Sequence, residues 1–141
     1  MIAEGPTTPD LVELTRRAYE YVSERNWEAL LSFYGADSVW DMSPVGLGTY
    51  EGPTAARRFF EDWTGSYENY SIEPQEILDF GNGVVFARVR QSGRPAGSSG
   101  DVSLLYAAVV SWKDGVIARL TNYTDIDEAR AAARRLAGQR E

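Results

Sequence analysis

The spacing of apolar residues changes once along this chain, near residue 69, and this change constrains the fold more than any other feature. Before it, apolar side chains recur at about 3.6-residue intervals, as on helices. After it, they alternate with polar ones, as on strands that bury one face. Helices followed by antiparallel strands with short turns are typical of an α+β domain. We therefore expect three helices on one face of a strongly curved sheet.

Capping residues and turn residues mark the expected elements. Helices are predicted to start at Thr8-Pro9-Asp10, with the proline at the first helical position, and at Asn26, Gly52-Pro53 and Asp125. Gly35 is expected to end the second of them. Strands are predicted over residues 38–42, 70–80, 84–91, 101–112 and 116–124, with a flexible connection over 92–100. Together they form one domain, residues 6–137, between flexible termini at 1–5 and 138–141.

The strand at 101–112 is apolar on both faces, which is unusual where one face of a sheet meets water. Leu105, Ala107 and Val109 should point away from the helices. Either the closing helix packs on this outer face, or a second copy of the chain does. The sequence favours a homodimer through the outer face of the sheet, because large exposed apolar patches usually mark interfaces. By alternation, Arg119 and Tyr123 would belong to that interface.

Composition excludes several kinds of chemistry. The 141 residues include no cysteine and no histidine, so thiolate and imidazole catalysis and the usual zinc ligands are ruled out. A net charge of −7 argues against nucleic acid as a partner. No run of residues reaches the roughly 20 apolar positions of a membrane span, and residues 1–5 lack a secretory pattern. We expect a cytoplasmic protein with no cofactor and no metal, with acid–base chemistry left to Asp, Glu, Tyr, Arg or Lys113.

Residues 38–52 combine a strand with a glycine-rich loop and resemble the mouth of a small-molecule pocket. Trp40 and Tyr50 could supply apolar walls, and Asp41 could supply a placed polar group. Pro44 ends the strand because its nitrogen cannot donate a hydrogen bond. Asp41 is the best-placed candidate for a general base, and its alternative role is a carboxylate that accepts hydrogen bonds from nearby backbone.

Several local patterns resemble the nuclear-transport-factor-2-like superfamily and, within it, the SnoaL-like proteins. The residues that carry the resemblance are Ala18-Tyr19, residues 26–30, Val39-Trp40-Asp41, Tyr50-Glu51-Gly52, residues 57–60, residues 114–119 and Tyr123-Thr124-Asp125. The resemblance covers about residues 8–136. It implies a cone-shaped barrel, made of a strongly curved, mixed, mostly antiparallel sheet packed on three N-terminal helices, plus a short C-terminal helix. It also implies a deep cavity and a common tendency to dimerise. The superfamily includes polyketide cyclases, ketosteroid-isomerase-like enzymes, epoxide hydrolases, dehydratases and non-catalytic proteins.

The catalytic pattern of the ketosteroid-isomerase-like enzymes does not transfer in register. The resemblance places the base at Met42, one residue after Asp41, and the tyrosine at Ala18, one residue before Tyr19. The protonated acid would fall at Ala108. An offset of one residue on a strand turns a side chain to the opposite face, although a bulge before Pro44 would turn Asp41 back inward. The carboxylate set of the epoxide hydrolases has no counterpart on the cavity-facing strand positions.

Two functional hypotheses follow. In the first, the cone binds a small hydrophobic, oxygenated, cyclic metabolite and catalyses cofactor-free isomerisation, cyclisation or dehydration. In the second, it is a non-catalytic ligand-binding or dimeric interaction module, which the missing second carboxylate favours. The candidate catalytic residues are Asp41, Asn122 and Tyr19. The candidate substrate-binding residues are Trp40, Met42, Tyr50, Phe60, Trp63, Gln91, Tyr106 and Leu120.

Overall fold

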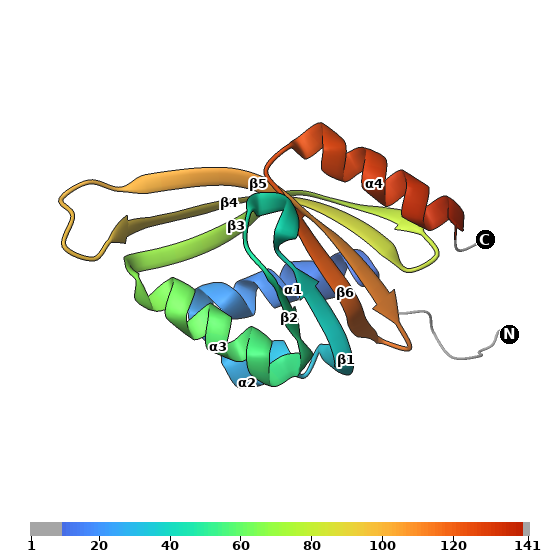
Figure 1. The fold of residues 1–141 in the computed structure, drawn as a ribbon, viewed down its shortest axis with the longest axis horizontal. Helices are drawn as coiled ribbons and strands as arrows, with labels where there is room; N and C mark the ends of the chain where they lie inside the picture. The colour runs from blue at the N-terminus through green and yellow to red at the C-terminus, as the bar shows by residue number, and fades with distance from the viewer. Residues whose placement is uncertain (1–9, 140–141) are drawn as a thin grey trace, which may run out of the picture.

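A computed structural model describes residues 10–139 of the chain (Figure 1). The elements in chain order are α1 (Leu11–Glu24), α2 (Trp27–Leu31), β1 (Tyr34–Asp41), the 3-10 turn η1 (Ser43–Val45), β2 (Thr49–Glu51), α3 (Gly52–Gly65), β3 (Tyr67–Gly81), β4 (Val84–Pro95), β5 (Val102–Lys113), β6 (Val116–Tyr123) and α4 (Ile126–Gln139). The predictions made for Thr8 and Pro9, and for the termini at 1–5 and 140–141, lie outside the described residues.

The six strands form one open, mixed sheet in the order β2-β1-β6-β5-β4-β3. β1 runs parallel to β6, and every other neighbouring pair is antiparallel. Helices α1, α2 and α3 lie on one side of this twisted sheet and α4 lies on the other (Figure 1). The predicted α+β architecture is therefore confirmed. Among the described residues, no helix is both long and apolar enough to cross a bilayer.

Side-chain caps fix the starts of three helices. The carboxylate of Asp10 accepts a hydrogen bond from the Glu13 amide at 3.2 Å, so Asp10 is the N-cap of α1 and does not lie in its first turn. Asn26 caps α2 in the same way at 3.2 Å, and Asp125 caps α4 at 3.0 Å. Gly35 does not end α2, which stops at Leu31; it lies instead in β1.

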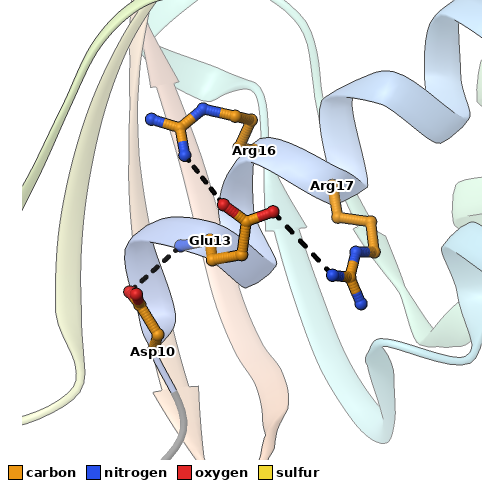
Figure 2. A network of polar contacts seen from close by, with 4 residues as sticks. All are labelled: Asp10, Glu13, Arg16 and Arg17. Carbon is orange, nitrogen blue, oxygen red and sulfur yellow. Dashed lines mark hydrogen bonds and ion pairs between the residues drawn. The ribbon is translucent and has the colours of Figure 1, made fainter.

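The exposed side of α1 carries a small network of charges (Figure 2). Glu13 lies 3.0 Å from Arg16 and 3.8 Å from Arg17, one helical turn further along. Such exposed pairs contribute about 0–1 kcal/mol each. They lie on the solvent-exposed face of α1, and the opposite face of the helix packs against the core.

Strands β1, β3 and β4 are longer than the sequence predicted, and β2 was not predicted at all. β4 continues through the expected flexible connection to Pro95, and the β4–β5 hairpin projects from the body of the molecule (Figure 1). Gly93 allows this continuation, because a Cβ atom there would lie 3.2 Å from the Tyr67 side chain of the neighbouring strand. The register of β3 against β4 shifts between Pro74 and Glu76, where the proline nitrogen cannot donate to the ladder.

Two apolar clusters pack on the two faces of the sheet. The larger lies between the sheet and α1–α3. The smaller lies under α4, where Phe86, Ala107 and Val109 of the sheet meet Ala129 and the later small residues of the helix. Ala107 and Val109, two of the three apolar outer positions of β5, are therefore covered by the closing helix, which is the first of the two explanations that the sequence left open.

Candidate ligand-binding cavity

A cavity of about 350 Å³ lies between α1–α3 and the inner face of the sheet. Its volume falls within the range of roughly 300–1,000 Å³ that is usual for small-molecule sites. One face of α1 contributes Thr15, Ala18, Tyr19 and Val22, because side chains three and four residues apart share a side of a helix. The predicted residues that line the cavity are Tyr19, Trp40, Met42, Phe60, Trp63, Gln91, Tyr106, Leu120 and Asn122.

Stacked aromatic rings build one wall of the cavity. The Trp40 ring stacks on Phe60 with a centroid distance of 4.4 Å, and Phe59 meets Trp40 edge-on at 4.7 Å. Tyr50, which was predicted to bind substrate, does not line the cavity. It pairs with Trp40 across β1 and β2 and packs against Phe59 at 4.9 Å. Tyr50 therefore supports the wall from behind.

Some polar groups of the cavity are satisfied within the protein. The Gln91 side-chain oxygen accepts hydrogen bonds from the Tyr70 hydroxyl at 2.9 Å and from the Trp63 indole nitrogen at 3.2 Å. The Trp112 indole nitrogen donates to the Thr15 hydroxyl at 3.2 Å. Gln91 thus has a structural role that accounts for its burial, since buried polar groups need partners.

Other polar groups of the cavity have no such partner. The Asn122 amide nitrogen donates to the Met42 sulfur at 2.9 Å, but its carbonyl oxygen is buried without a hydrogen bond among the described residues. The same holds for the Trp40 indole nitrogen. The hydroxyls of Tyr19 and Tyr106 form no hydrogen bond with any residue in 10–139. The Asn122 oxygen and the Trp40 nitrogen are closed off from the cavity, whereas a ligand in the cavity can satisfy the Tyr19 and Tyr106 hydroxyls.

The tyrosines of the cavity are held in the neutral form. Burial raises the pKa of Tyr19 and Tyr106 well above the ordinary value, and the neighbouring phenols raise it further. Burial raises the pKa of Tyr70, the third tyrosine that lines the cavity, in the same way. These hydroxyls are therefore hydrogen-bond donors over the whole physiological pH range, and none of them is a base.

Asp41 lies outside the cavity, on the opposite side of β1 from Trp40 and Met42. Its carboxylate accepts hydrogen bonds from the Ser43 amide at 2.9 Å, the Ser43 hydroxyl at 2.6 Å and the Arg119 guanidinium at 2.7 Å. Burial alone would raise the pKa of Asp41, but these bonds and the charge of Arg119 outweigh it and lower the pKa. The prediction that Asp41 could reach a ligand in the cone is therefore corrected. Strand alternation holds here, and the chain does not turn the carboxylate inward before Pro44.

Asp41 and Arg119 instead line a second depression of about 310 Å³ on the outer face, beside α4. Within residues 10–139, no carboxylate lines the inner cavity and no group of three or more acidic side chains could hold a metal ion. The inner cavity is therefore suited to uncharged ligands, and its polar chemistry is limited to hydroxyl, amide and indole groups.

Sequence reasoning missed several residues of the cavity. Tyr70 and Ile72 line it from the start of β3, and their alternation with polar residues was a usable signal. Val45 and Leu47 line it from the loop after β1. That loop has no periodicity, so nothing in its sequence indicated which side chains would turn toward the cavity.

Solved structures with this fold are numerous. A ketosteroid-isomerase-like protein from Catenulispora acidiphila, in complex with trimethylamine, is 18% identical and aligns over 83% of this chain and 86% of its own, with a TM-score of 0.70. TerC co-crystallised with polyporic acid is 17% identical over 89% and 98%, with a TM-score of 0.71. A protein described as a polyketide cyclase from Xanthomonas campestris is 24% identical over 86% and 94%, with a TM-score of 0.65.

At the level of sequence, no curated protein matches the chain. The SnoaL-like domain family, in contrast, matches residues 15–120, which include most of α1, all of α2 and α3, and most of the sheet. The match spans most of the residues that form the cavity. The chain therefore belongs to the SnoaL-like domain family.

Proposed function

We infer that this protein binds a small, uncharged, oxygenated ring compound in the inner cavity. One observation carries the inference: an aromatic cavity without a described charged group contains tyrosine hydroxyls that donate to no described residue. Its apolar walls favour a hydrophobic body, which is stabilised by about 25 cal/mol for each Å² removed from water.

The lack of charge in the lining selects against ionised ligands. Moving a carboxylate or ammonium group out of water costs many kcal/mol unless a counter-charge meets it. Neither an arginine nor an acidic residue is among the described residues that line the cavity. Arg119, the nearest candidate along β6, points to the outer face, where it binds Asp41. A neutral ligand avoids this desolvation cost.

The unpaired polar groups select for oxygen. Tyr19 and Tyr106 line the cavity with hydroxyl donors, so they complement a carbonyl, ether or hydroxyl oxygen of the ligand. Each such bond contributes about 0.5–1.5 kcal/mol, and its absence leaves a buried group unsatisfied.

Binding without turnover is the form of this proposal that the chemistry favours. Proton abstraction needs a base near the ligand, and the tyrosines of the cavity stay protonated because their pKa values are raised. Asp41 is engaged elsewhere. The competing proposal, cofactor-free isomerisation, cyclisation or dehydration, would need a base that the described lining does not contain.

The test compares three ligands of similar shape by titration calorimetry and tryptophan fluorescence. 2-Tetralone is a neutral bicyclic ketone, tetralin lacks the oxygen, and tetralin-2-carboxylate carries a charge. Three tryptophans line the cavity and report on occupancy: Trp40, Trp63 and Trp112. We expect 2-tetralone to bind about tenfold more tightly than tetralin, and the carboxylate not to bind. Equal or tighter binding of the carboxylate would contradict the proposal.

Variants locate the bound oxygen. Tyr19→Phe and Tyr106→Phe should weaken 2-tetralone binding by about three- to tenfold and leave tetralin unaffected. Tyr50→Phe is the matched control, because Tyr50 packs behind the wall. The same samples in D₂O separate binding from catalysis: protein-accelerated exchange of the protons next to the tetralone carbonyl, seen by NMR, would favour the enzymatic alternative.

We also propose, from the sequence, that the protein forms a homodimer through the outer face of the sheet. Because α4 covers Phe86, Ala107 and Val109, a second copy would have to use the strip beside it. Arg119 and Tyr123 point outward on this strip, as alternation predicted. The groove there combines apolar and polar side chains, which is the usual character of a non-obligate interface.

A further inference from the structure

Three polar side chains form a compact group on the outer side of β1, which we call the latch: Asp41, Ser43 and Arg119. One oxygen of Asp41 accepts both the Ser43 amide at 2.9 Å and the Ser43 hydroxyl at 2.6 Å, and the other accepts Arg119 at 2.7 Å. The Asp41 side chain is 13% exposed. Hydrogen bonds to a charged group are about twice as strong as neutral ones, so the latch is a strong local constraint.

The latch adjoins the loop of residues 42–48, the mouth loop, which forms part of the cavity wall. Val45 and Leu47 line the cavity, and Leu47 is still 41% exposed, so it lies at the rim. The loop is closed on itself by hydrogen bonds from the Val45 and Leu47 amides to the Met42 carbonyl, at 3.1 and 3.0 Å. Its first turn begins at Ser43, the residue that Asp41 holds.

Two glycines give the mouth loop the freedom to move if that hold is lost. Gly46 has φ +86°, a conformation that side chains other than glycine rarely adopt, and a Cβ on Gly46 or Gly48 would meet nothing within 4 Å. Apart from Asp41, the Ser43 amide donates to no described group. The Met42 amide also donates to the Gly48 carbonyl at 3.0 Å, and the Gly46 amide to the Ser43 carbonyl at 3.0 Å, so backbone bonds keep the loop compact. The carboxylate adds the contact that ties the Ser43 end of this compact loop to the Asp41–Arg119 pair on the sheet.

We propose that Asp41 is a positioning residue: through Ser43 and Arg119 it holds the mouth loop against the rim of the cavity and so limits how fast ligands enter and leave. This rests on the proposed binding function. It assigns to the latch a role in access to the cavity, separate from the chemistry inside it. Arg119 contributes from β6, which pairs with β1, so the loop is anchored to the sheet beside the cavity.

Amide hydrogen exchange measured by NMR tests the latch without any ligand. In Asp41→Ala, which removes all three hydrogen bonds, the amides of Val45, Gly46 and Leu47 should exchange about tenfold faster or more. The β5 amides should keep their wild-type rates. The matched control is Asp37→Ala, because Asp37 is exposed on the same strand and its carboxylate bonds to no described residue. Ser43→Ala, which removes one bond, should give a smaller effect in the same direction.

Ligand kinetics test the consequence for access. In stopped-flow fluorescence with 2-tetralone, Asp41→Ala should raise both the association and the dissociation rate about tenfold and leave the affinity within about twofold, because the loop is loosened in both states. Failure of 2-tetralone to bind the wild-type protein would overturn the proposed function alone. Hydrogen exchange, which needs no ligand, would still test whether the latch holds the mouth loop. Unchanged exchange of the mouth loop in Asp41→Ala, or equal acceleration in Asp37→Ala, would overturn the latch.

Discussion

Replacing Asn122 by leucine should make the ligand-free protein more stable. Asn122 is 5% exposed, its carbonyl oxygen has no partner among the described residues, and its amide nitrogen meets only the Met42 sulfur, a weak acceptor. An unsatisfied buried polar group costs about 1–3 kcal/mol. Leucine has a similar volume and removes that cost. We therefore expect the free energy of unfolding to rise by about 1–2 kcal/mol, measured by urea unfolding.

Gln91→Leu provides the matched contrast. Gln91 is as buried as Asn122, at 6% exposure, but it accepts hydrogen bonds from Tyr70 and Trp63. Its loss strands two buried donors, so this variant should lower the free energy of unfolding by about 2–4 kcal/mol. If Asn122→Leu also lost more than about 1 kcal/mol, Asn122 would be a structural residue, and the argument that its oxygen is an unsatisfied buried acceptor would be refuted.

Three further predictions concern the charged groups and the outer face. The folded-state pKa of Asp41 is lowered, so its stabilising effect is present at neutral pH and is lost as the pH falls below about 4 through the folded pKa. Urea unfolding of Asp41→Asn should therefore show a smaller loss of stability on acidification than the wild type, and an equal loss would contradict this. Phe86→Ala should cost about 3–5 kcal/mol by urea unfolding, because Phe86 is fully buried under α4 with Arg130 over its ring at 4.5 Å. A cost below about 1 kcal/mol would show that α4 does not depend on this contact. Sedimentation velocity should give a dimer that Tyr123→Glu dissociates, and a wild-type monomer at high concentration would contradict the proposed interface.

Strand periodicity was enough to place several of the cavity residues on β4, β5 and β6 from the sequence. Gln91, Tyr106 and Asn122 were placed on the inner face, and Arg119 and Tyr123 on the outer face, because side chains on a strand alternate wherever the register is regular. The same rule placed Asp41 outward unless a bulge intervened. The sequence alone could not decide this point, since a bulge depends on which partner strand is paired and how.

Contacts made outside regular elements could not be predicted. One of the two roles that the sequence offered for Asp41 was a carboxylate that accepts nearby backbone bonds, and the Ser43 amide supplies one at 2.9 Å, but the sequence did not identify Ser43 as the partner. Nothing in the sequence indicated that Leu47 would reach the cavity rim, because this follows from how one irregular loop folds back on β1. Tyr50 was misplaced for a related reason. β2 is three residues long and went unrecognised, so the packing of Tyr50 behind Trp40 could not be foreseen.

The most direct test of the binding claim is a crystal structure of the protein with 2-tetralone. The account predicts the ligand inside the inner cavity, with its carbonyl oxygen about 2.5–3.0 Å from the hydroxyl of Tyr19 or Tyr106. The mouth loop should close over it, with Leu47 at the rim. Ligand bound only in the outer depression beside Arg119, or bound in the cavity with its oxygen against the apolar wall, would contradict the claim that unpaired tyrosine donors select an uncharged oxygenated ligand.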